Sequence, residues 1–374
     1  MIFKLKHIND FIEINTELIQ DIKFKKLVDK EVLAVFSDFH KTNEKLSSPI
    51  FRFYFVNNFN KHWDNSSNFQ SMGNAHYYNG VFNLNAHGAH IILDTNEDIP
   101  TIYFLIKNKI KNDFLYRFKN SNFSSHVESQ INVFYYIVFL IFMQWYNITQ
   151  KTTFIHASSV AYKDNAYLLS ATSGIGKSSF LMAISKNHEF SFIADDLTIL
   201  KSNGKAFFLG RKMSVKPYHL IYFPWLNDLL KRKMGLMHRL QWKLFSKTKN
   251  LIFGLPIYSL FKSKPKTSIK VKKIFHLINH HKNNFESINL SSSDLSRISN
   301  AILQSEMFLG LEFFSQINYF NVETRFSTDS KFGSDTRIIL DNILQTIDIE
   351  GILVPYRSDP NDLVAFIKKR INNS

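Results

Sequence analysis

Short apolar clusters separated by polar residues in the first third of the chain predict short β-strands. Apolar clusters interrupted by Asn, Gly and Asp recur at 51–56, 81–94 and 101–106. Such punctuation is typical of strands that are joined by turns. Residues 1–127 are therefore predicted to form a variable N-terminal domain that is mixed or mainly β.

A continuous apolar stretch at 131–143 predicts a helix that connects this region to the rest of the chain, placed at 128–150. The stretch is shorter than the ~20 apolar residues of a spanning helix, and His126 and Gln144 flank it closely. We interpret it as a buried helix and expect no transmembrane segment. Residues 1–20 lack the apolar core of a signal peptide, so a cytoplasmic protein is expected.

The hydrophobic pattern changes after this helix. Residues 166–171 have the pattern of a strand, 177–186 have helical spacing, and 189–194 again have the pattern of a strand. Strand, loop, helix and strand with so short a crossover predict a βαβ unit. A nucleotide site is expected at the carboxyl ends of its strands, where Asp195 and Asp196 follow.

The C-terminal part continues with alternating strand and helix patterns. These elements are a strand at 269–278, a helix at 292–304, a strand within 351–359 and a helix at 360–371. Asn361 or Asp362 is expected to cap the last helix. Residues 151–374 are thus predicted to form one domain of mixed α and β structure, with a basic insertion at about 218–265.

Composition excludes some classes of protein, and net charge favours some classes of binding partner. Hydrophobic residues make up 45% of the chain, which excludes a disordered protein. The absence of cysteine excludes disulfides, thiolate zinc sites and cysteine nucleophiles. A net charge of +15 favours an acidic partner, such as a nucleotide, a nucleic acid, an acidic peptide or an anionic lipid.

Two other clusters suggest binding sites less directly. His87, His90 and Asp94 lack the further ligands that a metal site needs, so we interpret them as loop residues. Residues 229–250 contain Lys and Arg but no acid, and their apolar residues suggest an amphipathic helix. A solvated basic helix is the favoured interpretation. The alternatives are docking of an acidic substrate and binding to a membrane surface or a nucleic acid.

The segment 171–178 has the pattern of a phosphate-binding loop. Gly174 and Gly176 permit backbone torsions and a close approach that a Cβ would block. Main-chain N–H groups at the start of a helix suit phosphate oxygens, Lys177 suits the β- and γ-phosphates, and the Ser178 hydroxyl suits Mg²⁺. Ala171 replaces the usual first glycine, where a small side chain suffices. The predicted nucleotide-binding residues are Thr172, Ser173, Gly174, Ile175, Gly176, Lys177, Ser178 and Ser179.

Two adjacent carboxylates at the end of a strand can have separate roles in phosphoryl transfer. One can hold Mg²⁺ while the other takes the proton from an attacking hydroxyl. Asp195 and Asp196 stand at this position, and we expect their mutual repulsion to raise the pKa of one of them unless metal and lysine offset the charge. A pair that merely caps the next turn is the alternative. The expected cofactors are ATP and Mg²⁺.

Three motifs, HASSV at 156–160, SATSGIGKSS at 170–179 and IADD at 193–196, resemble the HPr kinase/phosphorylase family. They look most like the HPr-kinase-like enzymes found with lasso-peptide biosynthesis genes. The resemblance covers roughly residues 150–374 and is strongest over 154–200. It implies a phosphoenolpyruvate carboxykinase-like P-loop kinase core, so we expect a mixed α/β or α+β fold with that core and an N-terminal domain.

The resemblance also implies a role for each motif residue. Asp195 looks like the carboxylate that activates the acceptor hydroxyl, and Asp196 like the carboxylate that holds the metal with Ser178. An exchange of the two aspartates stays open. His156 matches a family histidine near the phosphates, although a buried core histidine is the alternative. Arg211 is expected to stabilise the transferring phosphoryl group.

Lys216 is an alternative to Arg211 as the cation that stabilises the transferring phosphoryl group. Other positions depart from the family pattern. Ser179 stands where HPr kinases usually have an acidic residue, and their glycine-rich downstream signature is missing apart from Gly210 and Arg211. Both departures argue against HPr as the substrate and against phosphorolysis.

The sequence therefore predicts an ATP- and Mg²⁺-dependent kinase. Its expected acceptor is a hydroxyl, with serine favoured, on a peptide or small precursor molecule. An acidic acceptor is one form of this expectation. A nucleotide-sensing interaction module with little transfer activity and a true HPr serine kinase are the alternatives. Nucleic acid is not expected as a partner, and homo-oligomer formation stays open.

Overall fold

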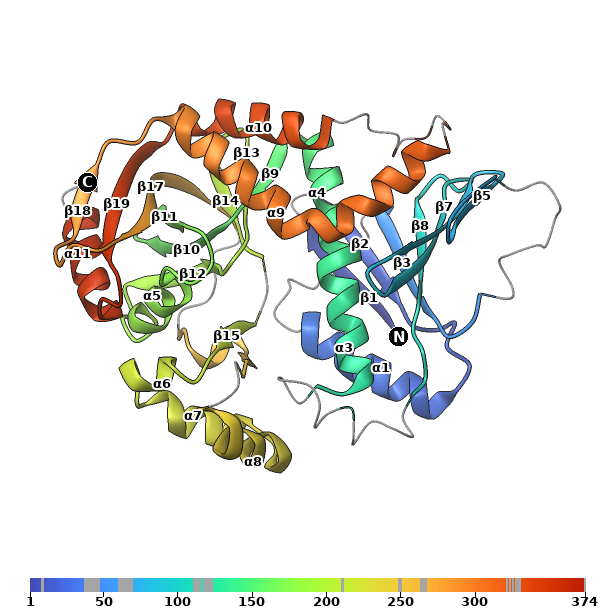
Figure 1. The fold of residues 1–374 in the computed structure, drawn as a ribbon, viewed down its shortest axis with the longest axis horizontal. Coiled ribbons are helices and arrows are strands. Elements are labelled where there is room, and N and C mark those ends of the chain that lie inside the picture. The colour runs from blue at the N-terminus through green and yellow to red at the C-terminus, as the bar shows by residue number, and fades with distance from the viewer. Residues whose placement is uncertain are drawn as a thin grey trace. The chain divides into compact units, whose positions relative to one another are not determined.

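The computed structural model divides the chain into two units of packed secondary structure (Figure 1). The structure describes residues 1–7, 10–36, 48–59, 70–109, 116, 124–209, 212–247, 251–262, 268–320, 322, 324, 326 and 331–372. The first unit comprises Met1–Asn120, Ser124–Trp145 and Glu306–Phe332, and the second mainly Tyr146–Ser305 and Gly333–Ser374. The domain ranges expected from the sequence, 1–127, 128–150 and 151–374, stay a prediction.

The described part of the first unit contains an eight-stranded mixed sheet in the order β1-β2-β3-β8-β7-β6-β5-β4. Parallel pairing joins β2 to β3 and β3 to β8, and the other neighbours are antiparallel. The strands expected at 51–56, 81–94 and 101–106 are confirmed. Their bounds are β1 Ile2–His7, β2 Asp10–Asn15, β3 Phe51–Val56, β4 Gln70–Met72, β5 Ala75–Tyr78, β6 Val81–Ala86, β7 Ala89–Asp94 and β8 Thr101–Leu105.

The apolar stretch after this sheet is a helix, as expected. It runs through α3 (His126–Val133), the π-helical turn η2 (Phe134–Phe139) and α4 (Leu140–Thr149). Ser125 and Glu128 form a capping box at its start, which satisfies N–H groups that the first turn leaves unpaired. The helix is long and apolar enough to cross a membrane, yet 67% of the most apolar window is buried inside the protein.

Helix packing in the first unit requires a glycine at one crossing. α1 (Ile22–Phe36) packs against α3, and the second half of α9 (Ser292–Tyr319) approaches η2. A Cβ at Gly310 of α9 would lie 2.6 Å from the carbonyl oxygen of Ile137. The two helices can therefore approach this closely only because Gly310 has no side chain.

The described part of the second unit contains a nine-stranded mixed sheet. Seven strands follow the order β12-β10-β11-β17-β14-β13-β9, and β19 pairs with both β17 and β18. A separate two-stranded sheet pairs β15 with β16. The bounds are β9 Thr152–Ile155, β10 Ala157–Tyr162, β11 Asn165–Ser170, β12 Phe190–Ala194, β13 Thr198–Lys201, β14 Lys205–Phe207, β15 Met213–Val215, β16 Phe253–Leu255, β17 Ser268–His280, β18 Glu286–Ile288 and β19 Asp348–Pro355.

The expected strand, helix and strand around the glycine-rich loop are present as β11, α5 (Lys177–Ile184) and β12. β10 is antiparallel to both strands, so β11 and β12 run parallel with β10 between them. The carboxyl ends of β11 and β12 therefore lie at the same edge of the sheet. α5 packs against α11 (Pro360–Asn372) (Figure 1).

β17, the start of α9, β19 and α11 lie where strands and helices were expected, but α10 (Lys331–Leu344) and β18 were not predicted and the cap of α11 differs. α10 precedes β19, and α11 follows it. The Asp359 carboxylate accepts a hydrogen bond from the Asn361 N–H at 2.8 Å. Pro360 is the first helical residue, a position whose N–H has no partner within the helix, so a proline costs no hydrogen bond there. The expectation that Asn361 or Asp362 caps α11 is therefore wrong, because the cap lies before Pro360.

The basic region forms two helices where one amphipathic helix was expected. After α6 (His219–Tyr222), the chain forms α7 (Leu226–Lys233) and α8 (Leu236–Phe245), and a short 3₁₀ turn, η3, follows at Ile257–Ser259. Met234 and Gly235 between α7 and α8 have extended torsions. Met234 is only 4% exposed, because it packs into the core beneath α7.

Candidate functional site

The glycine-rich loop joins the carboxyl end of β11 to the start of α5. Gly174 and Gly176 have φ values of +89° and +109°, which residues with a Cβ rarely adopt. The Phe180 N–H donates to the Gly176 carbonyl at 2.8 Å and closes the first helical turn. Ala171 is fully buried in the apolar cluster beneath the loop, which fits the need for a small side chain there.

The loop residues expected to face a nucleotide are mostly accessible. Thr172, Ser173 and Gly174 are exposed, Ile175, Gly176 and Ser178 are half-buried, and Lys177 and Ser179 are buried. The Lys177 ammonium donates to the carbonyl oxygens of Ala171 at 2.9 Å and Thr172 at 3.0 Å. The only full charge on the loop therefore lies against the main chain at its beginning.

Asp195 follows β12 and lies beside the loop serine. Its carboxylate accepts hydrogen bonds from the hydroxyl of Ser178 at 3.1 and 3.2 Å, and from that of Ser158 at 2.7 Å. The residue is only 4% exposed. Burial, and then the negative charge of Asp196, raise the pKa of the Asp195 carboxyl to about 6, although the two hydroxyls oppose this rise.

Asp196 adopts a strained conformation next to Asp195. Its φ is +73°, and the Leu197 N–H donates to the Asp195 carbonyl at 2.9 Å, which forms a tight γ-turn. Strain of this kind persists where the surrounding structure enforces it, and it concentrates at functional sites. The turn directs the two neighbouring carboxylates to different partners.

A buried histidine is the partner of Asp196. His156 Nε2 lies 2.9 Å from the Asp196 carboxylate, which is 39% exposed. Partial burial favours the neutral acid, but the hydrogen bond from His156 and the charges of His156, Lys177 and Lys216 outweigh it and lower the pKa of Asp196. The two aspartates therefore have pKa values displaced in opposite directions.

The structure describes only one of the two cations proposed from the sequence. Arg211 lies outside the described residues. Lys216 contributes to the lowered pKa of Asp196, so its charge acts on that aspartate. The main-chain N–H of Lys216 donates to His219 Nδ1 at 2.9 Å, and this bond holds the turn before α6.

Three side chains around this site were not assigned roles from the sequence. Ser158 is the first, and it lies in β10 between the two strands that carry the loop and the aspartates. Burial raises the pKa of Tyr218, the Ser179 side chain opposes this rise, and the charge of Asp195 adds to it. The serine after the motif histidine was visible in the sequence, but the position of Tyr218 depends on a separate loop.

His276 is the third, and it lies directly beside the strand that leads into the loop. The parallel register of β11 and β17 pairs Ser170 with His276, and His276 Nδ1 lies 3.4 Å from the Ser170 hydroxyl. Burial, and then the charge of Lys177, lower the pKa of His276 to about 4, so the ring is neutral at physiological pH.

The donor set fits a Mg²⁺ ion whose remaining ligands are phosphate oxygens and water. Among the described residues, three or more His, Asp or Glu side chains nowhere converge in a metal cage. Mg²⁺ in phosphoryl-transfer sites is usually held by one or two carboxylates, substrate phosphates and water. The Ser178 hydroxyl and the aspartate pair supply such a partial set next to the loop.

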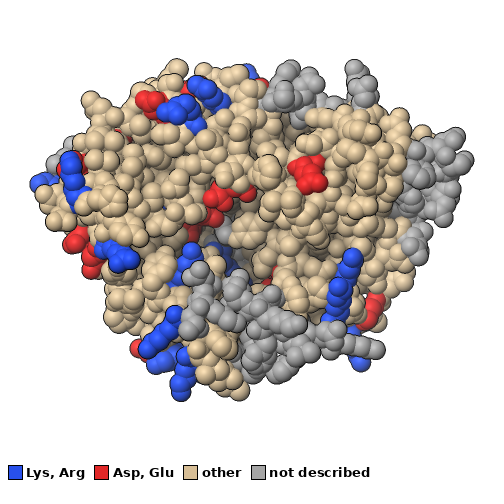
Figure 2. Space-filling view, in the orientation of Figure 1, with Lys and Arg blue, Asp and Glu red and all other residues tan. Residues whose placement is uncertain are grey.

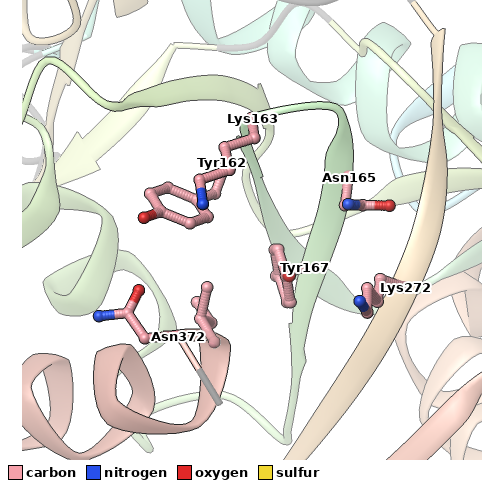
Figure 3. Close-up of a pocket in the computed structure, with 7 residues that line it drawn as sticks. Tyr162, Lys163, Asn165, Tyr167, Lys272 and Asn372 are labelled. Carbon is pink, nitrogen blue, oxygen red and sulfur yellow. The ribbon is translucent and has the colours of Figure 1, made fainter. Parts of the chain in front are cut away.

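A hollow of about 380 Å³ lies at the opposite end of β11 from the loop (Figure 3). Tyr162, Lys163 and Asn165 from the β10–β11 turn line it, together with Tyr167 and residues of β17 and α11. The hollow contains none of the loop residues or aspartates. It is therefore separate from the candidate phosphate site.

No family model matches this chain, and no curated protein matches it. Among solved structures, the chain is similar to the HPr(Ser) kinase/phosphatase from Coxiella burnetii. The sequence identity is 12%, the match covers 59% of this chain and 95% of that chain, and the TM-score is 0.27. A likeness this distant does not establish a shared fold.

Proposed function

We propose that this protein binds ATP with Mg²⁺ and transfers the γ-phosphate to a hydroxyl group. The observation that carries the proposal is the 3.1 Å contact between the Ser178 hydroxyl of the loop and the Asp195 carboxylate. It brings the parts that in-line phosphoryl transfer needs, a phosphate cradle, a metal-side hydroxyl and a carboxylate, to one edge of the sheet.

The loop and its lysine would hold the triphosphate. The main-chain N–H groups at the start of α5 form the positive end of the helix dipole, which suits phosphate oxygens. Lys177 would exchange its two carbonyl partners for phosphate oxygens, since an ammonium donates more strongly to an anion than to a neutral carbonyl. Lys216 or Arg211 would then face the transferring phosphoryl group.

The opposite pKa displacements of the two aspartates suggest how they divide the work. Asp195, with its pKa raised to about 6, is suited to accept a proton from the acceptor hydroxyl near neutral pH. Asp196 stays ionised and, with Ser178, would hold the metal. His156 would act as a positioning residue that fixes the Asp196 carboxylate. Bound Mg²⁺ would neutralise charge on the β- and γ-phosphates.

The acceptor we propose is a serine hydroxyl on a peptide or small precursor, of the kind that lasso-peptide kinases phosphorylate. HPr itself is disfavoured because Ser179 replaces the acidic residue of HPr kinases. A phosphoenolpyruvate carboxykinase-like core and a cytoplasmic location belong to the same proposal. An acidic acceptor would match the net charge of +15.

Transfer of radioactive γ-phosphate from ATP to serine-containing peptides tests this function. We expect Asp195→Asn to keep ATP affinity while its turnover falls by roughly 10²–10⁴-fold, as for the loss of a general base. Lys177→Ala is expected to lose ATP affinity as well. Asp164→Asn in the exposed β10–β11 turn is the matched control and should leave both unchanged. Transfer that survives in Asp195→Asn would show that the base is wrongly assigned.

One observation favours a nucleotide-sensing module as the second candidate. Both carboxylate oxygens of Asp195 are engaged by internal serine hydroxyls, and the residue is 4% exposed. A sensor would bind ATP tightly, hydrolyse it slowly or not at all, and bind a partner in only one nucleotide state, without phosphorylating any acceptor. Ser158→Ala distinguishes the kinase from the sensing module. Removing the Ser158 hydroxyl frees one side of Asp195, which should alter the rate of phosphoryl transfer of a kinase but leave ATP affinity unchanged.

A further inference from the structure

Helices α7 and α8 of the second unit form a strongly basic surface. Between residues 226 and 247 the only acid is Asp228, which is outnumbered six to one by exposed Lys and Arg. Figure 2 shows Lys and Arg side chains gathered at the lower left, over α7. The exposed basic residues are Lys231, Arg232, Lys233, Arg239, Lys243 and Lys247.

A row of exposed leucines runs along α8 beside these cations. Leu236, Leu240 and Leu244 are 77%, 45% and 56% exposed, and their spacing of four residues places them on one side of the helix. Gln241 on another side is only 6% exposed, and Trp242 packs against the core. α8 is therefore anchored along one side and presents leucines along another.

We propose that α7 and α8 dock this protein onto an anionic lipid membrane. The leucines are 45–77% exposed, so they can insert into the boundary between headgroups and acyl chains. The neighbouring Lys and Arg side chains would meet the acidic headgroups. This arrangement, an apolar row bordered by cations, is that of a helix lying in a membrane surface.

The leucine row favours a membrane over the other acidic partners. A nucleic-acid backbone is bound through its phosphates, and three exposed leucines contribute nothing to such contacts. An acidic peptide would pair with the cations but would need a groove for its side chains. A lipid surface uses both features of α8 at once, because it offers negative charge above an apolar layer.

Flotation of the full-length protein with lipid vesicles tests the proposal, and it needs no nucleotide. The vesicles contain phosphatidylcholine with roughly one-third phosphatidylserine, or phosphatidylcholine alone. We expect binding only to the anionic vesicles. Substitution of Lys231, Arg232 and Lys233 by Gln should weaken it by on the order of a hundredfold, because each basic residue near such a surface contributes roughly fivefold.

Substitution of Leu236, Leu240 and Leu244 by Ser should also weaken binding, and most clearly at high salt, where screening leaves the apolar contribution dominant. Matched controls come from α1, where Lys23, Lys26 and Lys30 are exposed and Ile22 and Leu27 are 71% and 38% exposed. Gln at those three lysines, or Ser at Ile22 and Leu27, should change binding at most a few-fold.

Several results would overturn the proposal. One is the absence of flotation, and another is an equal loss in the α1 controls, which would indicate attraction by net charge alone. Binding that needs the cations but not the leucines, and that transfers to duplex DNA or an acidic peptide, would identify a different partner. A kinase assay is not involved, so this proposal can fail while the proposed function stands.

Discussion

Replacing Asp195 by asparagine should stabilise the folded protein near neutral pH. The carboxylate is 4% exposed and lies beside the negative charge of Asp196, so its ionised form is unfavourable in the folded state. An amide of the same shape removes the charge and keeps an oxygen that can accept from Ser158 or Ser178. An active-site group that lowers stability in this way is an expected compromise between stability and activity.

The size and sign of the effect follow from the pKa of Asp195. Below its ordinary value of 3.8, the carboxyl is protonated in both the folded and the unfolded chain. Between 3.8 and about 6 the unfolded chain releases the proton first, so the stability of the wild type falls as pH rises. At about 1.4 kcal/mol per pH unit, the loss above pH 6 is on the order of 3 kcal/mol.

Urea unfolding followed by tryptophan fluorescence measures this difference. Asp195→Asn should unfold at a higher urea concentration than the wild type at about pH 7.5, and the advantage should shrink toward about pH 4. Asp196→Asn is the matched control with the opposite sign. Its pKa is lowered by His156 and nearby lysines, so loss of that charge should destabilise the protein at neutral pH.

Two outcomes would refute this reasoning. If Asp195→Asn were no more stable than the wild type above pH 6, the buried carboxylate would be fully compensated by its partners. If the variant were more stable by the same amount at every pH, the gain would come from packing instead of ionisation.

Three other substitutions test the fold and the loop. Gly310→Ala should lower the free energy of unfolding by roughly 1–3 kcal/mol, because its Cβ would meet the Ile137 carbonyl at 2.6 Å, and an unchanged urea midpoint would contradict this. Gly176→Ala should weaken ATP binding about tenfold by calorimetry, since alanine is strained at a φ of +109°. Glu350→Gln should destabilise the protein at neutral pH, because Arg370 donates to Glu350 at 2.6 Å. Partial burial favours neutral Glu350, but hydrogen bonds from a serine and two cations lower its pKa, so the wild-type advantage should vanish as pH falls below 4.5.

Local patterns in the sequence were sufficient for the elements around the loop and for several C-terminal strands and helices of the second unit. The short strand-like run at 166–171 and the helical spacing over 177–186 predicted β11 and α5, and Gly174 and Gly176 indicated the turn between them. These features depend on residues a few positions apart, whose torsions and burial are set by neighbours along the chain. The cap of α11 was misplaced by this logic, because both candidates lay after the proline that begins the helix.

The contacts of the candidate site were beyond local patterns. Ser158 reaches Asp195 because β10 enters the sheet between β11 and β12, and His276 lies beside Ser170 only through the register of β17. Strand order and register arise from pairing between distant segments. The sequence could name the two aspartates, but it could not assign Ser178 to Asp195 or His156 to Asp196.

The sequence by itself determined the loop, the acids after β12, and the basic charge of the region after α6, because each is a property of neighbouring residues. The tertiary structure alone decided which aspartate is buried, which is paired with a histidine, and which leucines of α8 stay exposed. Burial and pKa depend on the dielectric and charges that distant segments bring together. Those quantities exist only once the chain has folded.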